Sequence, residues 1–149
     1  MRVVVQRSKE ASCTVDGKIT GKIDHGLVLL VGFTEGDNKD IIDYMVKKII
    51  NLRIFDDENG VMNKSIDLEN DQILSISQFT LYADTTKGNR PSYVKALNSK
   101  YATMLYDCFN KELSNYIKVE TGIFGADMKI NLLNDGPVTI ILEKENSNV

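Results

Sequence analysis

The chain has 149 residues, 42% of them hydrophobic and 26% charged, and a formal net charge of −3. This length fits one domain over residues 1–149 with its own core, and the slight negative charge argues against a general nucleic-acid-binding domain, which is usually strongly basic. No stretch approaches the roughly 18 apolar residues of a membrane span, and the start, MRVVVQRSKE, lacks the apolar core of a signal peptide. We therefore expect a cytoplasmic protein that does not enter a membrane.

The first half of the chain predicts strands and one helix. Residues 1–8 alternate as a strand does, Asp16-Gly17 indicates a hairpin turn, and GLVLLVGF at 26–33 predicts a strand buried on both faces. A helix follows, with Asn38 as its N-cap. Its apolar stripe has helical spacing: Ile42, Met45, Val46, Ile49 and Ile50. A charged connection with a glycine, residues 52–66, ends this half.

The second half opens with a predicted buried strand, SISQFTLYAD at 75–84, whose apolar run is interrupted by Ser77, Gln78 and Thr80. In a regular strand Gln78 and Thr80 would share one face, and Ser77 the opposite one. Pro91 and Ser92 introduce a second predicted helix. We expect its apolar stripe to lie in the core: Val94, Leu97, Tyr101, Met104, Leu105 and Cys108.

Residues 116–144 mix strand patterns with glycine turns, and 146–149 should fray. This order of elements implies a single mixed α/β domain rich in antiparallel pairing.

Candidate chemistry starts from the interrupted strand. Ser77 and Thr80 could be nucleophiles only with a base nearby, and the one histidine, His25, stands beside a glycine in an expected turn. A Ser-His-Asp triad is therefore disfavoured. Cys13 and Cys108 are too few for a disulfide framework and are expected to pack in the core. No His, Cys or carboxylate spacing matches a metal site, so we expect neither metal nor cofactor.

A second unusual stretch is NDGPVT at 134–139. Its first residues suit a turn, after which Pro137 would open the final strand. A Gly-Pro bond can also be cis, and two carbonyl oxygens pointing the same way would suit an ammonium group. The sequence leaves both interpretations open.

Four motifs in this order, SQFTLYAD, KGNRPSY, GIFGADM and NDGPVT, resemble those of the bacterial and eukaryotic D-aminoacyl-tRNA deacylases. The resemblance covers essentially the whole chain. It implies a barrel-like fold with two main helices, and hydrolysis of the ester between a D-amino acid and tRNA. It also implies a homodimer in which each subunit's Gly-Pro motif enters the partner's active site, where it would exclude L-aminoacyl-tRNA. Because glycine has no side chain to exclude, we also expect some hydrolysis of glycyl-tRNA.

The resemblance also implies roles for individual residues. The family's Ser-Gln-x-Thr motif gives the expected catalytic set: Ser77, Gln78, Phe79 and Thr80. The Phe79 backbone N–H is the candidate oxyanion donor. The Gly-Pro motif falls on Gly136 and Pro137, whose carbonyls would receive the substrate's amino group, with Arg7 as a brace. The pocket would be lined by Phe124, Gly125 and Met128.

Residues 85–100 hold the longest basic stretch without an acid, and we expect tRNA phosphates to meet Lys87, Arg90 and Lys95 there, although a solvated face is the commoner meaning of such a run. Thr80 could be a covalent nucleophile, but assistance by the substrate's own ribose hydroxyl is favoured because Thr80 lacks a base. Two other functions stay open. One is a non-catalytic RNA-binding or assembly domain, and the other is a related deacylase with a different substrate.

Overall fold

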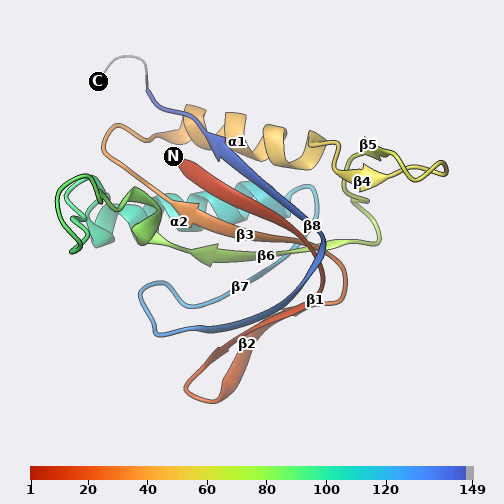
Figure 1. Ribbon diagram of the computed structural model, residues 1–149, viewed down its shortest axis with the longest axis horizontal. Helices are drawn as coiled ribbons and strands as arrows, with labels where there is room; N and C mark the ends of the chain where they lie inside the picture. The colour runs from red at the N-terminus through yellow and green to blue at the C-terminus, as the bar shows by residue number, and fades with distance from the viewer. Residues whose placement is uncertain (147–149) are drawn as a thin grey trace.

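The computed structural model describes residues 1–146, so the expected frayed tail falls almost wholly outside the described residues. Its main feature is one six-stranded, nearly closed sheet with the order β2-β1-β3-β6-β7, in which β8 also pairs with β1 (Figure 1). The strands are β1 (Arg2–Val15), β2 (Lys18–Ile23), β3 (Gly26–Gly32), β6 (Gln72–Ser77), β7 (Lys118–Thr121) and β8 (Lys129–Glu143). The predicted mixed α/β, barrel-like fold is confirmed.

Strand β1 organises the sheet because it pairs with three others. It runs antiparallel to β2, β3 and β8. Strands β3, β6 and β7 run parallel to one another. The predicted hairpin between β1 and β2 is confirmed, with Asp16 and Gly17 both at positive φ, 49° and 76°. Strand β3 is buried along almost its whole length, as its apolar sequence predicts.

Two helices, α1 (Lys39–Asn51) and α2 (Ser99–Ser114), pack their buried faces into one core with β1, β3 and β6. The Asn38 side chain accepts a hydrogen bond from the Ile41 N–H at 3.1 Å, which confirms the predicted cap of α1. The predicted stripe of α1 is buried throughout. The charged connection after α1 forms a small hairpin, β4 (Phe55–Asp56) and β5 (Met62–Lys64). Neither α1 nor α2 is long and apolar enough to cross a membrane.

The predicted stripe of the second helix is only partly right. Helix α2 begins only at Ser99, where the Asn98 side chain accepts from the Lys100 N–H at 3.0 Å. Its buried residues are Ala102, Tyr106, Phe109 and Leu113. Of the expected stripe, Leu97, Leu105 and Cys108 are half-buried, whereas Val94, Tyr101 and Met104 are exposed by 90%, 58% and 62%. The segment before α2 instead forms isolated bridges, Ser92 with Asp84 and Ala96 with Thr34, and a turn at 94–95 lies between them.

Gly26 allows β3 and β6 to meet. Its φ is +142°, and an added Cβ would lie 1.9 Å from the Gln72 carbonyl oxygen. We expect Gly26→Ala to lower the free energy of unfolding by about 3 kcal/mol or more, because backbone atoms must move apart. Gly60→Ala is the matched control. It also has positive φ, +73°, but nothing lies within 4 Å of its Cβ, so only about 1–2 kcal/mol should be lost. Urea denaturation measures both, and equal losses would contradict the packing argument.

Candidate active site

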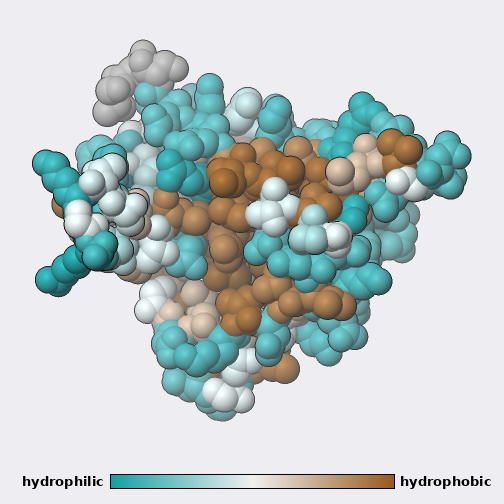
Figure 2. Space-filling model, in the orientation of Figure 1, coloured by the Kyte–Doolittle hydropathy of each residue, from teal (hydrophilic) through white to brown (hydrophobic). Residues whose placement is uncertain are grey.

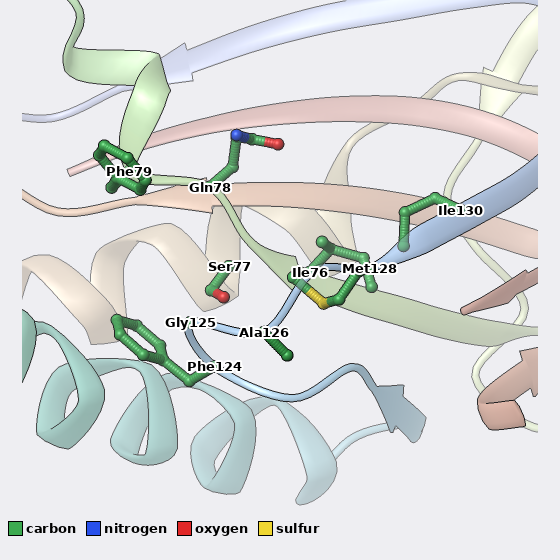
Figure 3. A pocket seen from close by; sticks show the side chains of 9 residues that line it. All are labelled: Ile76, Ser77, Gln78, Phe79, Phe124, Gly125, Ala126, Met128 and Ile130. Carbon is green, nitrogen blue, oxygen red and sulfur yellow. The ribbon is translucent and has the colours of Figure 1, made fainter. Parts of the chain in front are cut away.

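A hollow of about 240 Å³ lies where β6 ends, and we call it the pocket (Figure 3). It is enclosed by the end of β6, by the short helix that follows, η1 (Phe79–Tyr82), and by the segment between β7 and β8. Its lining residues are Ile76, Ser77, Gln78, Phe79, Phe124, Gly125, Ala126, Met128 and Ile130. The structure therefore brings two of the four recognised motifs together, SQFT and GIFGADM.

The predicted strand over 75–84 is only partly right, because β6 stops at Ser77. The Gln78 N–H donates to the Val31 carbonyl at 2.7 Å, and the chain then enters the 3-10 turn of η1. Gly32 explains how the turn fits against β3: a Cβ there would lie 2.9 Å from the Gln78 carbonyl oxygen. Since the strand ends here, alternation fails and Ser77, Gln78 and Phe79 all line the pocket.

The start of η1 leaves a main-chain N–H without an acceptor in the helix, in a residue that lines the pocket. Phe79 is the first residue of this helix, so its N–H has no acceptor within it. The Gln78 side-chain amide donates to the Thr80 hydroxyl at 2.5 Å. Thr80 is half-buried and is not among the pocket-lining residues. The hydroxyl thus contacts an amide, which cannot act as a base.

Apart from Ser77 and Gln78, the side chains that line the pocket are apolar. Phe79 and Phe124 flank the hollow from η1 and from the segment before β8 (Figure 3). The Phe124 ring packs against Tyr106 of α2, with 5.8 Å between ring centroids. Gly122 leaves room for Met128, since a Cβ at Gly122 would lie 2.4 Å from the Met128 sulfur. The pocket thus combines a polar part, Ser77 and Gln78, with an otherwise apolar lining, as small-molecule sites commonly do.

Arg2 holds η1 from outside the pocket, a contact that the sequence pattern did not indicate. Its Nη1 donates to the Leu81 carbonyl at 2.5 Å, and its guanidinium lies 4.8 Å from the centroid of the Tyr82 ring. Its Nη2 and Nε donate to the two Glu143 carboxylate oxygens at 2.8 and 3.2 Å. This hydrogen bond raises the pKa of Arg2 and lowers the pKa of Glu143. The first residue of β1 and the last of β8 therefore fix the turn.

The Gly-Pro motif lies within β8 rather than in a turn. Gln6 pairs with Thr139 and Ser8 with Asn134, so residues 135–138 bulge opposite Arg7. The Gly136-Pro137 bond is cis. Both residues are exposed, and neither is among those that line the pocket of the same chain.

Arg7 is buried, with 8% of its surface exposed. Its Nε donates to the Asp135 carbonyl at 2.9 Å, next to the Gly-Pro motif. Its Nη1 donates to the Ile54 carbonyl at 2.9 Å and approaches an Asp56 carboxylate oxygen at 3.4 Å. Arg7 therefore connects the bulge of β8 to the start of the β4–β5 hairpin.

The basic residues lie on an exposed loop beside η1. Asp84 and Ser92 close it with two backbone bonds of 2.7 and 2.9 Å, and Lys87 and Arg90 are exposed between them. Lys95 lies 3.3 Å from an Asp84 carboxylate oxygen. Hydrogen bonds from the Thr86 hydroxyl and N–H, with Lys95 adding to them, lower the pKa of Asp84 to about 2.

His25 and the cysteines lie away from this chemistry. His25 precedes β3, whose other end pairs with the pocket residue Ser77, and its Nδ1 lies 2.5 Å from an Asp71 carboxylate oxygen. Cys13 is buried and Cys108 is half-buried against the core. Within residues 1–146 no group of three or more His, Cys, Asp or Glu side chains could hold a metal ion.

Comparison with known proteins places these features in context. A family model described as D-Tyr-tRNA(Tyr) deacylase matches residues 4–143. A solved structure described as "c-Myc DNA Unwinding Element Binding Protein" is 38% identical, with a TM-score of 0.90 over 98% of this chain and 100% of that one. A second, described as "Structural Analysis of a probable eukaryotic D-amino acid tRNA deacylase", is 18% identical, with a TM-score of 0.78 over 95% and 97% of the two chains, and supports the fold alone.

Proposed function

The chain belongs to the D-Tyr-tRNA(Tyr) deacylase family, whose activity is the hydrolysis of D-aminoacyl-tRNA, and we propose that it removes D-amino acids from tRNA while sparing L-aminoacyl-tRNA. The observation that carries the proposal is the Phe79 N–H at the start of η1, in a residue that lines the pocket together with Ser77 and Gln78. Side-chain identity should matter little, and glycyl-tRNA should be cleaved to some extent.

The chemistry needs little from protein side chains. An aminoacyl ester is already activated, and Phe79 N–H would stabilise the oxyanion as water adds to the carbonyl carbon. Collapse of this intermediate breaks the bond to the ribose oxygen. The neighbouring ribose hydroxyl relays the proton from water to that oxygen, so free amino acid and tRNA result. Removing one such donor typically costs about 2.7–4 kcal/mol of transition-state stabilisation.

Thr80 supports this site rather than attacking the ester. A threonine nucleophile needs a base to take its proton, and the contact found for its hydroxyl is the Gln78 amide. Thr80 thereby fixes the orientation of Gln78 at the edge of the pocket.

Rejection of L substrates would come from a second subunit. Gly136 and Pro137 are exposed and outside their own pocket, while Arg7 is buried beside them. In a homodimer their carbonyls would bind the substrate's ammonium group in the partner's pocket. An L side chain would then collide with this backbone, whereas a D side chain would point to solvent.

An apolar surface supports such a dimer. Figure 2 shows apolar side chains gathered over the middle of the face on which β8 lies. Leu133 and Ile141 of β8 are exposed by 58% and 67%. A continuous apolar patch on a protein surface commonly marks an interface.

Nucleic-acid binding without catalysis is the competing function. The 38% identical structure is described as that of a protein that binds a DNA element. For this chain the exposed loop with Lys87 and Arg90, together with Lys95, would supply phosphate contacts to tRNA that weaken as salt rises. Hydrolysis of a charged tRNA separates the two functions, since only a deacylase releases the amino acid.

Purified protein should cleave D-tyrosyl-tRNA at least about 100-fold faster than L-tyrosyl-tRNA, because a clash with main-chain atoms discriminates more strongly than an apolar pocket does. Release of labelled tyrosine from each ester measures both rates, and glycyl-tRNA is the third substrate. Comparable rates on the two enantiomers would remove the steric account. Binding of both without cleavage would favour the competing function.

Thr80→Val should slow turnover by no more than about tenfold, because it removes only the hydrogen bond between the Thr80 hydroxyl and the Gln78 amide. The matched control is Thr86→Val, because the Thr86 hydroxyl also has a side-chain partner, Asp84, but lies in the exposed loop. Single-turnover rates with D-tyrosyl-tRNA measure the effect. Loss of all turnover in both Thr80→Val and Thr80→Ala would instead identify Thr80 as the nucleophile.

Mixed dimers test the exchange of the Gly-Pro motif. One subunit carries Gln78→Ala in the pocket, and the other carries Gly136→Ala in the motif. The added Cβ at position 136 would lie 2.9 Å from the Val138 side chain and 3.1 Å from Arg7 Nη2. If the motif acts on the partner, one of two sites combines both defects and the other has none, so about half of the wild-type rate should return. The two variant homodimers are the controls. A mixed dimer as inactive as they are, or a monomeric protein, would contradict the proposal.

A further inference from the structure

An exposed pair of aromatic rings extends the pocket onto the surface. Phe79 and Tyr93 meet edge to face, with 5.1 Å between centroids and 69° between the ring planes. Phe79 lines the pocket and Tyr93 does not. The two side chains are nonetheless 56% and 43% exposed. An exposed aromatic surface therefore continues outward from the place where the ester would bind.

We propose that Tyr93 is a stacking platform for the unpaired nucleotide that precedes the terminal, ester-bearing nucleotide of tRNA. This inference rests on the proposed function. With the terminal nucleotide bound in the pocket, the preceding nucleotide would lie at the edge of the pocket beside Phe79. Proteins that bind single-stranded nucleic acid commonly combine a cationic surface with aromatic rings, because every base offers a flat face.

The charge around Tyr93 favours this occupant. From residue 85 to residue 106 the chain contains no acid, and it holds Lys87, Arg90, Lys95 and Lys100. Of these four, Lys95 is paired with the Asp84 carboxylate at 3.3 Å. Lys87 and Arg90 are exposed in the loop closed by Asp84 and Ser92, directly before Tyr93. A cationic strip that borders an exposed ring suits a polyanion carrying flat bases.

The segment that presents Tyr93 is fixed before any ligand binds. The Tyr93 carbonyl accepts from the Ala96 N–H at 3.0 Å, and the Leu97 N–H donates to the Phe33 carbonyl at 3.0 Å. The Thr34 hydroxyl donates to the Lys95 carbonyl at 2.6 Å. Because these bonds tie the segment to the end of β3, stacking on Tyr93 would cost little additional ordering.

The alternative is that the exposed Tyr93 ring contacts a second copy of the chain. Val94, next along the chain, is 90% exposed and would suit such a contact. The exposed Lys87 and Arg90 would repel the same two residues of a second copy, whereas they would attract RNA phosphates, so RNA is favoured.

Two substrates of different length separate these roles. D-tyrosyl-tRNA carries the preceding nucleotide, and D-tyrosyl-adenosine lacks it. Tyr93→Ala should lower kcat/KM on the tRNA substrate by roughly tenfold, mainly through KM, and change the adenosine substrate less than about twofold. Tyr93→Phe should keep the wild-type values on both. The matched control is Tyr116→Ala, because Tyr116 is also 43% exposed but lies between α2 and β7.

Binding of uncharged tRNA gives an answer that does not need hydrolysis. Tyr93→Ala should weaken binding of tRNA with an intact 3′ end and leave binding of tRNA trimmed by two nucleotides unchanged. Equal losses on the long and short substrates would overturn the proposal and make Tyr93 a support for Phe79. A changed elution volume in gel filtration would assign Tyr93 to a subunit contact. If the wild-type protein cleaves neither substrate, the proposed function fails, and the binding comparison still decides the role of Tyr93.

Discussion

The hydrogen bond from the Gln78 N–H to the Val31 carbonyl ties the residue after β6 to β3, and the pocket depends on the turn that follows this bond. Beyond this bond the chain turns tightly over Gly32, where a side chain would strike the Gln78 carbonyl. The turn brings three consecutive residues, 77–79, to the same hollow. Arg2 then holds the turn at the Leu81 carbonyl. A main-chain bend is thus the part of the fold that makes the site.

Local signals in the sequence predicted the parts of the fold that are fixed locally. The cap at Asn38 and the stripe of α1 are both confirmed, because a cap and a helical period involve residues within a few turns. The end of β6 was missed because the glycine that leaves room for the turn, Gly32, lies on another strand. The predicted stripe of the second helix is only partly right, because backbone bonds keep residues 92–97 out of the helix and the buried face of α2 runs through Ala102, Tyr106 and Phe109.

The motifs of the candidate site were visible in the sequence, but their arrangement was not. SQFT and GIFGADM meet across one pocket, while Gly136 and Pro137 face outward on a bulge of β8. Pairing registers and the burial of Arg7 follow from the closed sheet, which no local pattern encodes. The roles assigned to Gln78, Thr80 and the Gly-Pro motif stay predictions.

The composition of the pocket wall has a consequence for acid–base behaviour. Its nine lining residues are isoleucine, serine, glutamine, phenylalanine, glycine, alanine and methionine, none of which gains or loses a proton near neutrality. A reaction in the pocket therefore has no titrating side chain among these nine residues to donate or accept a proton. An inflection of turnover with pH would therefore report the α-amino group of the bound aminoacyl ester rather than a side chain of the pocket wall, and would move when the esterified amino acid is replaced by one of different basicity.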